Sequence, residues 1–293
     1  MPCVVTTLEY LKDLELYQLE KPYFCLMPAS DATQVDNEQI DNLEFESHHD
    51  IRIEDIRPLK EKYELDEYGF EVLSHTSRFL DLHSENGLSS TMALAEYQIE
   101  TEDMLNSHLG AVFVKCYDIV MRRNIIIDET VFDLKDQMHV IGPARGAHND
   151  ITYHSGPNII NRYLSDDEKQ RYFKPGYRFR IVNTWRSTLP VLEDRPLALC
   201  DSRTVAPSDL IACDRIIPDR VGEVYYLKYN SQHKWYWLSR QTCFEPLVFV
   251  LYDTKAGNHA RFCPHVSFPN PEAPINAPPR RSVETRSIVV TQE

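Results

Sequence analysis

The second half of this chain is a succession of short segments rich in β-branched and aromatic residues, and this pattern constrains the fold more than any other feature. Seven such segments follow residue 176, and Pro, Gly, Asn and Asp separate them. Few helices are predicted between them, so the pattern favours a β-sandwich, jelly roll or barrel. The predicted strands are YRFRIVNTWRST, RPLALCDSRTV, GEVYYLKYN, HKWYWLSRQ, EPLVFVLYDT, ARFCPHVSF and RRSVETRSIVVT.

The residues ahead of these segments predict an irregular α+β lead-in. Short strands are predicted over residues 20–30 and 48–59, with polar loops between them, and a longer strand over residues 111–123. No internal repeat or low-complexity block divides the chain, and glycine is scarce, at 9 of 293 residues. A chain of this length is long enough to form one domain with a large core.

Two helices are predicted from the residues at their ends. The longer one covers residues 89–110, because Ser90 or Thr91 can cap its start and Gly110 can end it. The shorter one lies within residues 165–176, where a capping-box pattern precedes the helix and a Pro-Gly pair stops it. The remaining residues after 140 are predicted to form strands and loops.

Composition and charge exclude several classes of function. A net charge of −14 argues against a nucleic-acid partner, which would require clustered Lys and Arg. No apolar run approaches the ~20 residues that span a bilayer, and the opening MPCVVTTLEY lacks the features of a signal peptide. The seven cysteines occur singly, which indicates reduced thiols. We therefore expect a cytoplasmic protein with no membrane or nucleic-acid partner, for which a homodimer stays open.

Three places in the chain carry a histidine two residues before a carboxylate, so this pattern alone cannot identify a metal site. The first is interpreted as a solvated loop in the acidic lead-in, and the second as part of the loop that enters the long helix. The third follows the strand-like MHVIGPAR and precedes all the predicted strands of the second half. The three motifs are His48-His49-Asp50, His83-Ser84-Glu85 and His148-Asn149-Asp150.

His148 and Asp150 fit the ligand set of a mononuclear iron(II) oxygenase. Such a centre needs two neutral imidazoles and one carboxylate on one face of the metal. A His-x-Asp pair at the end of a strand points both side chains to the same side, because strand side chains alternate. The third ligand would come from a strand much later in the chain. We predict His265 for this role, with His233 in SQHKWYWL as the alternative.

The residues after His265 contain a candidate site for a carboxylate. Arg280 and Ser282 are two residues apart, so they share a face of the last predicted strand. A guanidinium and a hydroxyl in this arrangement can bind one carboxylate together. The distal carboxylate of 2-oxoglutarate is a cosubstrate group that needs such a site. Arg186 and Arg286 stay open as alternatives.

Several ordered blocks of the chain resemble a mostly fungal family of iron(II)/2-oxoglutarate-dependent oxygenases of natural-product biosynthesis. That family includes gibberellin desaturase-like proteins, proteins related to cephalosporin methoxylation and a novofumigatonin endoperoxidase. The resemblance spans nearly the whole chain. It is carried by the His-x-Asp motif and by EKPYF, DIRPLKEKYELDEYGFEVLSH, EYQIETEDML, VNTWRSTLPVLEDRPLALCDSRTVAPSDL, HKWYWL, EPLVFVLYDT, PHVSF and PPRRSVETRSIVV.

The resemblance implies a mainly β fold with a double-stranded β-helix, or jelly-roll, core. It implies a single domain over residues 1–293, in which a lead-in of residues 1–135 packs on a core of residues 136–293. It also implies the site residues. His148, Asp150 and His265 would bind iron(II), and Arg280 and Ser282 would bind 2-oxoglutarate, with O2 as the other cosubstrate.

For the reaction, the resemblance implies oxidation of an unactivated C–H position of a fungal secondary metabolite. A terpenoid or meroterpenoid is the expected substrate, and hydroxylation, desaturation and endoperoxide formation all stay open. Trp185, Arg186, Tyr225 and Trp235 are predicted to line the substrate pocket, with core packing as the alternative for the aromatic residues. Two other functions stay open: a cupin-like metal enzyme without 2-oxoglutarate, and a non-catalytic β-sandwich that binds a small molecule.

Overall fold

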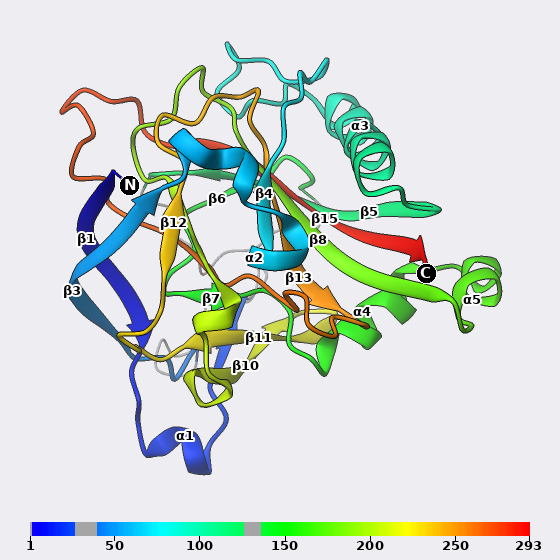
Figure 1. Ribbon diagram of the computed structural model, residues 1–293, viewed down its shortest axis with the longest axis horizontal. Coiled ribbons are helices and arrows are strands. Elements are labelled where there is room, and N and C mark those ends of the chain that lie inside the picture. The colour runs from blue at the N-terminus through cyan, green and yellow to red at the C-terminus, as the bar shows by residue number, and fades with distance from the viewer. Residues whose placement is uncertain (1, 27–39, 126–135) are drawn as a thin grey trace.

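The computed structural model describes residues 2–26, 40–125 and 136–293, and its strands form two curved sheets (Figure 1). Within these residues the smaller sheet has six strands, in the order β4-β13-β8-β15-β5-β6. They are β4 (Phe70–Val72), β5 (Phe113–Arg123), β6 (Val140–Ile141), β8 (Tyr177–Ser187), β13 (Leu247–Asp253) and β15 (Arg281–Gln292).

The larger sheet has nine strands among the described residues, in the order β1-β3-β12-β9-β14-β7-β11-β10-β2. Two antiparallel pairs flank its middle strands, β1 with β3 and β10 with β11. The strands are β1 (Cys3–Leu11), β2 (Tyr23–Cys25), β3 (Phe45–Asp55), β7 (His148–Asn149), β9 (Leu197–Cys200), β10 (Leu210–Ile217), β11 (Arg220–Leu227), β12 (Trp235–Trp237) and β14 (His265–Ser267).

Strands from both sheets form a double-stranded β-helix. Strands β5, β8, β13 and β15 lie together in the smaller sheet, and β7, β9, β12 and β14 lie together in the larger one. In chain order, these eight strands alternate between the two sheets. The one exception is that β9 and β12, which follow each other in this set, both lie in the larger sheet. The predicted jelly-roll core is therefore confirmed. It takes in β5, which ends at Arg123, ahead of the predicted start at residue 136.

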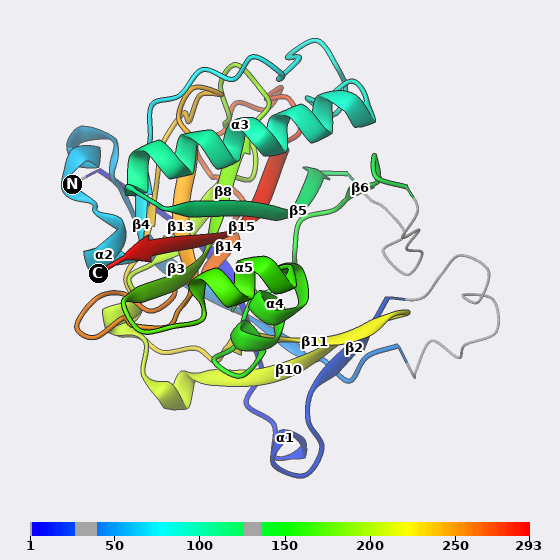
Figure 2. The same cartoon turned by 90° about the vertical axis from the view of Figure 1, so that its right-hand side faces the viewer.

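Strand β15 is the centre of the smaller sheet. It pairs with β8 along one edge and with β5 along the other, and residues 282–290 are all buried. Its even-numbered residues face the space between the sheets, where Ile288 packs in the largest apolar cluster. Its odd-numbered residues, among them Val283 and Val289, face the opposite way. Helix α3 (Thr91–Leu109) covers that outer face (Figure 2).

Both predicted helices are present with the predicted ends. In α3 the Ser90 hydroxyl accepts a hydrogen bond from the Ala93 N–H, and Gly110 ends the helix at a positive φ of 58°. Helix α5 (Asp166–Tyr172) begins with the predicted capping box. Two further helices are single turns, α1 (Leu16–Leu19) and α2 (Leu65–Tyr68). Within the described residues, no helix has the length and apolar character needed to cross a membrane.

Helix α4 (Ser155–Tyr163) was not predicted. Its Gly156 and Pro157 indicate a turn in the sequence, yet both lie in the first helical turn, where proline needs no hydrogen-bond donor. A Cβ atom at Gly156 would lie 2.4 Å from the Tyr252 ring, so the close packing of α4 on β13 requires glycine.

Several strands were also missed or misplaced by the sequence-based prediction. Strand β10 was missed because Asp214 and Arg215 interrupt its apolar pattern, and β1 was missed in the lead-in. The strand predicted over residues 48–59 is present as β3, which begins earlier and ends at Asp55, so the His48 motif lies in a strand rather than a loop and is partly solvated as expected. Of the strand predicted over residues 20–30, residues 27–30 lie outside the described residues.

Candidate metal centre

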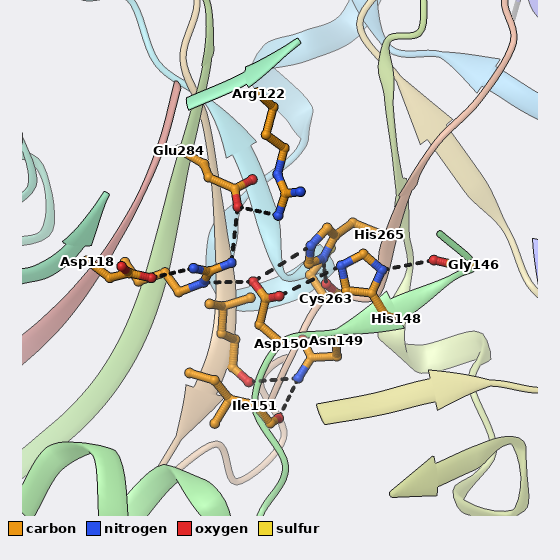
Figure 3. A network of polar contacts seen from close by, with 12 residues as sticks. Asp118, Arg122, Gly146, His148, Asn149, Asp150, Ile151, Cys263, His265 and Glu284 are labelled. Carbon is orange, nitrogen blue, oxygen red and sulfur yellow. Dashed lines mark hydrogen bonds and ion pairs between the residues drawn. The ribbon is translucent and has the colours of Figure 1, made fainter. Parts of the chain in front are cut away.

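His148 and His265 lie directly opposite each other on the neighbouring antiparallel strands β7 and β14. Asp150 follows two residues after His148 and turns to the same side. Its Oδ1 lies 3.7 Å from His148 Nε2, and its Oδ2 lies 3.9 Å from His265 Nε2. Potential ligand atoms of the three residues lie within 4.8 Å of one another, and the side chains converge on one point (Figure 3).

Both imidazole rings are oriented by the same backbone contact. His148 Nδ1 lies 2.9 Å from the carbonyl oxygen of Gly146, and His265 Nδ1 lies 3.1 Å from that of Cys263 (Figure 3). A carbonyl oxygen only accepts hydrogen bonds, so each Nδ1 carries a proton and donates it. Each neutral ring therefore presents the lone pair of Nε2, which is the atom that faces Asp150.

The charge states of the three groups suit a divalent metal. Burial lowers the pKa of His148 and lowers the pKa of His265 to about 4, so both rings are neutral near pH 7. Burial alone would raise the pKa of Asp150, but its neighbours together, Arg286 foremost and then His265 and His148, more than offset this and hold that pKa well below its usual range. Neutral imidazoles and an ionised carboxylate are the protonation states that bind a metal.

Asn149 fixes the backbone between the first two of these residues. Its amide nitrogen donates to the carbonyl oxygens of Ile151 at 2.6 Å and Leu251 at 3.0 Å (Figure 3). The side chain is fully buried and points away from His148 and Asp150, because alternate strand residues face opposite sides. The bond to Leu251 ties β7 to β13, so it links the metal-facing turn to the opposite sheet.

Arg286 joins Asp150 to a buried network of charges. Its Nε donates to Asp150 Oδ2 at 3.0 Å, its Nη2 donates to Glu284 Oε1 at 3.0 Å, and its Nη1 donates to Asp118. Glu284 also accepts from Arg122 Nη2 at 2.9 Å. Every side of the Arg286 guanidinium therefore meets a carboxylate, so Arg286 is the partner of Asp150 rather than a free site for a cosubstrate. Sequence patterns did not indicate this network.

Ser282 lies at the other end of the inward-facing row on β15, and Arg280, just before the first residue of that strand, continues the row. Both are buried, and Arg280 packs over the ring of Trp185 at 5.9 Å. No described residue accepts a hydrogen bond from Nε or Nη2 of Arg280 or engages the Ser282 hydroxyl. Burial lowers the pKa of Arg280 to about 9, and nearby Arg122 acts in the same direction. A buried cation without an acceptor is costly, so an anionic ligand would relieve this position.

Arg281 turns away from this row, as its position next to Arg280 predicts. Its Nη1 donates to the carbonyl oxygen of Ser84 at 2.5 Å and its Nη2 to that of Leu82 at 3.3 Å. It therefore anchors the loop that precedes α3. It takes no part in the interior of the jelly roll.

A cavity of about 790 Å³ opens beside the three converging side chains. His148, Asp150 and Arg286 form part of its wall, and Tyr226 lies on the strand next to His148. Its volume falls in the range of pockets that bind small organic molecules, about 300–1,000 Å³. The apolar part of its lining includes residues that the sequence did not indicate, among them Phe24, Leu43, Phe45, Val120, Val224 and Tyr226.

The four predicted pocket residues do not line this cavity. Trp185 belongs to the main apolar core, and the Trp235 indole donates to Tyr10 Oη at 2.9 Å inside a second core cluster. Arg186 is held by the carbonyl oxygens of His75 and Cys243. Tyr225 lines a separate cavity of about 310 Å³.

His233, the alternative third ligand, is not brought to the centre. Its Nε2 lies 3.1 Å from Asp209 Oδ2, and its ring stacks on Tyr10 with 5.9 Å between ring centroids. Arg186, the other alternative for the cosubstrate, is likewise occupied by backbone carbonyls. Among the candidates the structure therefore groups His148, Asp150 and His265, and leaves Arg280 with unused donors.

The fold and the site define a class of protein: a jelly roll that carries two histidines and one carboxylate in the arrangement used by non-haem iron oxygenases. A family model described as an oxidoreductase/YMDC permease-like domain matches residues 8–290. The hydroxylase/desaturase efuI of Hormonema carpetanum is 30% identical, and the alignment covers 83% of this chain and 84% of that protein.

Other relatives carry more explicit names. The Fe(II)/2-oxoglutarate-dependent dioxygenase nvfI of Aspergillus novofumigatus is 25% identical over 92% of this chain and 91% of its own. The alpha-ketoglutarate-dependent dioxygenase tstK of Talaromyces stipitatus is 26% identical over 82% and 84%. The chain therefore belongs to the fungal family of iron(II)/2-oxoglutarate-dependent dioxygenases of secondary metabolism.

Solved structures agree with this fold. The iron and alpha-ketoglutarate-dependent endoperoxidase NvfI superposes with a TM-score of 0.81 at 22% sequence identity, covering 99% of each chain. A single-site variant of the same enzyme gives 0.84 at 23% identity, covering 99% of this chain and 98% of the variant. At these identities the likeness establishes the jelly-roll fold.

Proposed function

We propose that His148, Asp150 and His265 hold iron(II) in an enzyme that uses 2-oxoglutarate and O2 to oxidise a C–H bond of a small fungal metabolite. One observation carries the proposal: two imidazole Nε2 atoms and one carboxylate, from strands β7 and β14, converge within 4.8 Å. Two histidines and one carboxylate are the ligands that such iron centres use, and they leave further positions open.

The donor set fits iron(II) as it stands. Both rings are neutral and already rotated so that Nε2 points at Asp150, and Asp150 is ionised. Iron(II) bound here together with 2-oxoglutarate would supply the activation of O2 and the oxidising power. The protein's own part is to hold three ligand atoms on one side and keep the other side open to the cavity.

Arg280 and Ser282 fit the distal carboxylate of 2-oxoglutarate. They offer two guanidinium donors and one hydroxyl, all buried and all without a partner among the described residues. A carboxylate with two oxygens matches a guanidinium that presents two donors in one plane. Arg286 does not fit this role, because its donors already bind Asp150, Glu284 and Asp118.

The substrate is proposed to be a hydrophobic, polycyclic terpenoid or meroterpenoid. The cavity volume of about 790 Å³ and the aromatic wall of Phe24, Phe45 and Tyr226 support a bulky apolar skeleton. One relative is named as the GA4 desaturase of a gibberellin cluster, others as hydroxylase/desaturase, and NvfI as an endoperoxidase. The proposal is therefore limited to oxidation at carbon, without a choice among these outcomes.

We propose a cytoplasmic location, a single domain over residues 1–293 and no nucleic-acid partner. The seven cysteines are all unpaired, which supports a reducing compartment, and the net charge of −14 opposes binding to phosphate backbones. A homodimer stays a prediction that light scattering on the purified protein would test.

The assignment is tested by anaerobic spectroscopy. Iron(II) and 2-oxoglutarate added to the protein should produce a weak visible charge-transfer band, and His148→Ala should abolish it. His48→Ala is the matched control, because it removes the histidine of the other His-x-Asp motif, on the partly solvated strand β3. A fully iron-loaded protein without the band, or a band that His148→Ala leaves intact, would overturn the assignment.

A further inference from the structure

The cavity beside the candidate iron site carries more positive charge than the rest of the molecule. Its lining includes six arginines and five carboxylates, in a chain whose net charge is −14. Each of the five carboxylates already has a partner. Asp118 and Asp150 bind Arg286, Asp214 and Glu223 bind Lys21, and Asp41 accepts from the Leu43 N–H.

Five of the six arginines are also engaged. Arg286 and Arg122 belong to the network around Asp150, and Arg162 and Arg220 bind Asp219. Arg145 packs over the Phe45 ring at 4.6 Å and lies 3.6 Å from Glu9. Arg215 is the exception: no carboxylate among the described residues lies within 4.0 Å of its guanidinium.

Arg215 occupies the cavity wall at a defined distance from the iron ligands. On β10 it pairs with Gly222 of β11 on one side and Phe24 of β2 on the other. Farther along β11, Tyr226 pairs with His148. Four residues of strand separate Gly222 from Tyr226, or roughly 13 Å. The backbone of Arg215 and that of His148 therefore lie at two ends of one stretch of cavity wall.

The surface between these ends is apolar. Phe24, Phe45, Val224 and Tyr226 line the cavity and pack together, with ring centroids 5.3 Å apart for Phe45 and Tyr226 and 6.5 Å apart for Phe24 and Tyr226. A ligand that follows this wall would lay an apolar skeleton on the rings. Its far end would then meet the guanidinium of Arg215.

We propose that Arg215 binds a carboxylate of the substrate, so that the substrate class is an apolar polycyclic acid oxidised at a carbon remote from its acid group. This inference rests on the proposed function, which places the oxidising centre at His148. The lone guanidinium supplies planar donors that suit a carboxylate, and partial burial strengthens such a contact. Burial lowers the pKa of Arg215, and the cations Arg286 and Arg122 together with burial outweigh the opposing effect of Asp118 and Asp150, so an added anion is favoured there.

The test compares an acid with its neutral analogues. Dehydroabietic acid, its methyl ester and the corresponding alcohol are titrated by calorimetry into the anaerobic protein loaded with iron(II) and 2-oxoglutarate. The native protein should bind the acid at least about tenfold more tightly than either neutral probe, the contribution of one charge-assisted hydrogen bond. Equal affinities, or no binding of any of the three, would overturn the proposal without requiring any variant.

Variants then locate the preference. Arg215→Gln should reduce the affinity for the acid to that for the ester, and Arg215→Lys should retain part of the difference. Arg220→Gln is the matched control, since Arg220 lines the same cavity but binds Asp219. A preference for the acid that survives in a folded Arg215→Gln protein would overturn the assignment.

The same titrations separate this inference from the proposed function. Arg215→Gln should retain the visible band of the iron(II)/2-oxoglutarate complex, because Arg215 touches none of the proposed ligands. If the native protein lacks that band, the iron assignment fails. The preference for the acid, repeated in iron-free protein, would then still report on Arg215.

Discussion

The two ends of the inward-facing row on β15 differ in how their charges are satisfied. At the Arg286 end, each donor side meets Asp150, Glu284 or Asp118. At the Arg280 end, Nε, Nη2 and the nearby Ser282 hydroxyl have no partner among the described residues. Both ends are buried and both carry an arginine. The difference teaches that a buried arginine is informative about a ligand only when its own protein leaves it unpaired.

The comparison predicts opposite roles for the two arginines. Arg286 positions a metal ligand, so its loss should weaken iron binding. Arg280 has unused donors that can bind an anion, so its loss should weaken 2-oxoglutarate binding and leave iron binding intact. Variants of Asp150, Arg286 and Arg280 test this division.

The largest effect is expected for Asp150→Asn. The change removes the negative charge of the metal ligand. It also weakens the contact with Arg286 that orients this side chain, because the guanidinium then faces a neutral amide. We expect iron(II) binding and 2-oxoglutarate turnover to fall to background, measured by the visible band and by succinate formation. Turnover at more than a tenth of the native rate would contradict the role given to Asp150.

Arg286→Gln should have the next largest effect. Groups that orient a metal ligand typically contribute about 10–100-fold to metal affinity, so iron(II) should bind more weakly by that factor. The affinity for 2-oxoglutarate at saturating iron should change little. The dissociation constants of iron(II) and of 2-oxoglutarate are both measured. A variant that loses only affinity for 2-oxoglutarate would contradict the assignment and indicate that Arg286 binds the cosubstrate.

Arg280→Gln should raise the dissociation constant of 2-oxoglutarate by about 30-fold, since a hydrogen bond to a charged group contributes about 1.5–3 kcal/mol. Iron(II) affinity without 2-oxoglutarate should stay within twofold of the native value. Arg281→Gln is the matched control, because Arg281 is the next residue along the chain and its side chain binds the carbonyl oxygens of Ser84 and Leu82. Equal losses in the two variants would point to a general effect on β15.

The smallest effect on the site is expected for an ion pair outside it. Burial raises the pKa of Glu245, but Arg57, Thr242 and Lys60 together lower it to about 2. The ionised Glu245 therefore stabilises the fold above pH 4.5. This contribution, about 3 kcal/mol at most, is lost as the pH falls toward 2. In the Glu245→Gln variant, the free energy of unfolding should depend less on pH between pH 4.5 and 2 than in the native protein. Iron binding at pH 7 should not change.

Much of the fold could be predicted because the sequence carries local signals for it. The seven strands of the second half, the cap at Ser90 and the capping box at Ser165 all appear as expected. Helix α4 was missed because tertiary packing on Tyr252 requires a glycine that signals a turn in isolation. Strand β10 was missed because Asp214 and Arg215 break its apolar pattern.

In the site, the sequence indicated residue pairs that are two positions apart in the chain. It did not indicate the contact between Arg286 on β15 and Asp150, which follows β7 of the other sheet. The separation of two residues in His148 and Asp150, and in Arg280 and Ser282, predicts a shared face. The pairing of Arg286 with Asp150 joins residues 136 positions apart, and no local pattern reports it. The predicted pocket aromatics do not line the cavity, whose wall combines residues of β2, β10 and β11 with residues of β5 in the other sheet.

Anomalous diffraction from an anaerobic crystal loaded with iron(II) and 2-oxoglutarate tests the central claim most directly. At the iron absorption edge, the account predicts one peak in bonding contact with Nε2 of His148, Nε2 of His265 and a carboxylate oxygen of Asp150. It also predicts density for a carboxylate on Arg280. A peak elsewhere, or His148 and His265 facing different spaces in the loaded protein, would contradict it.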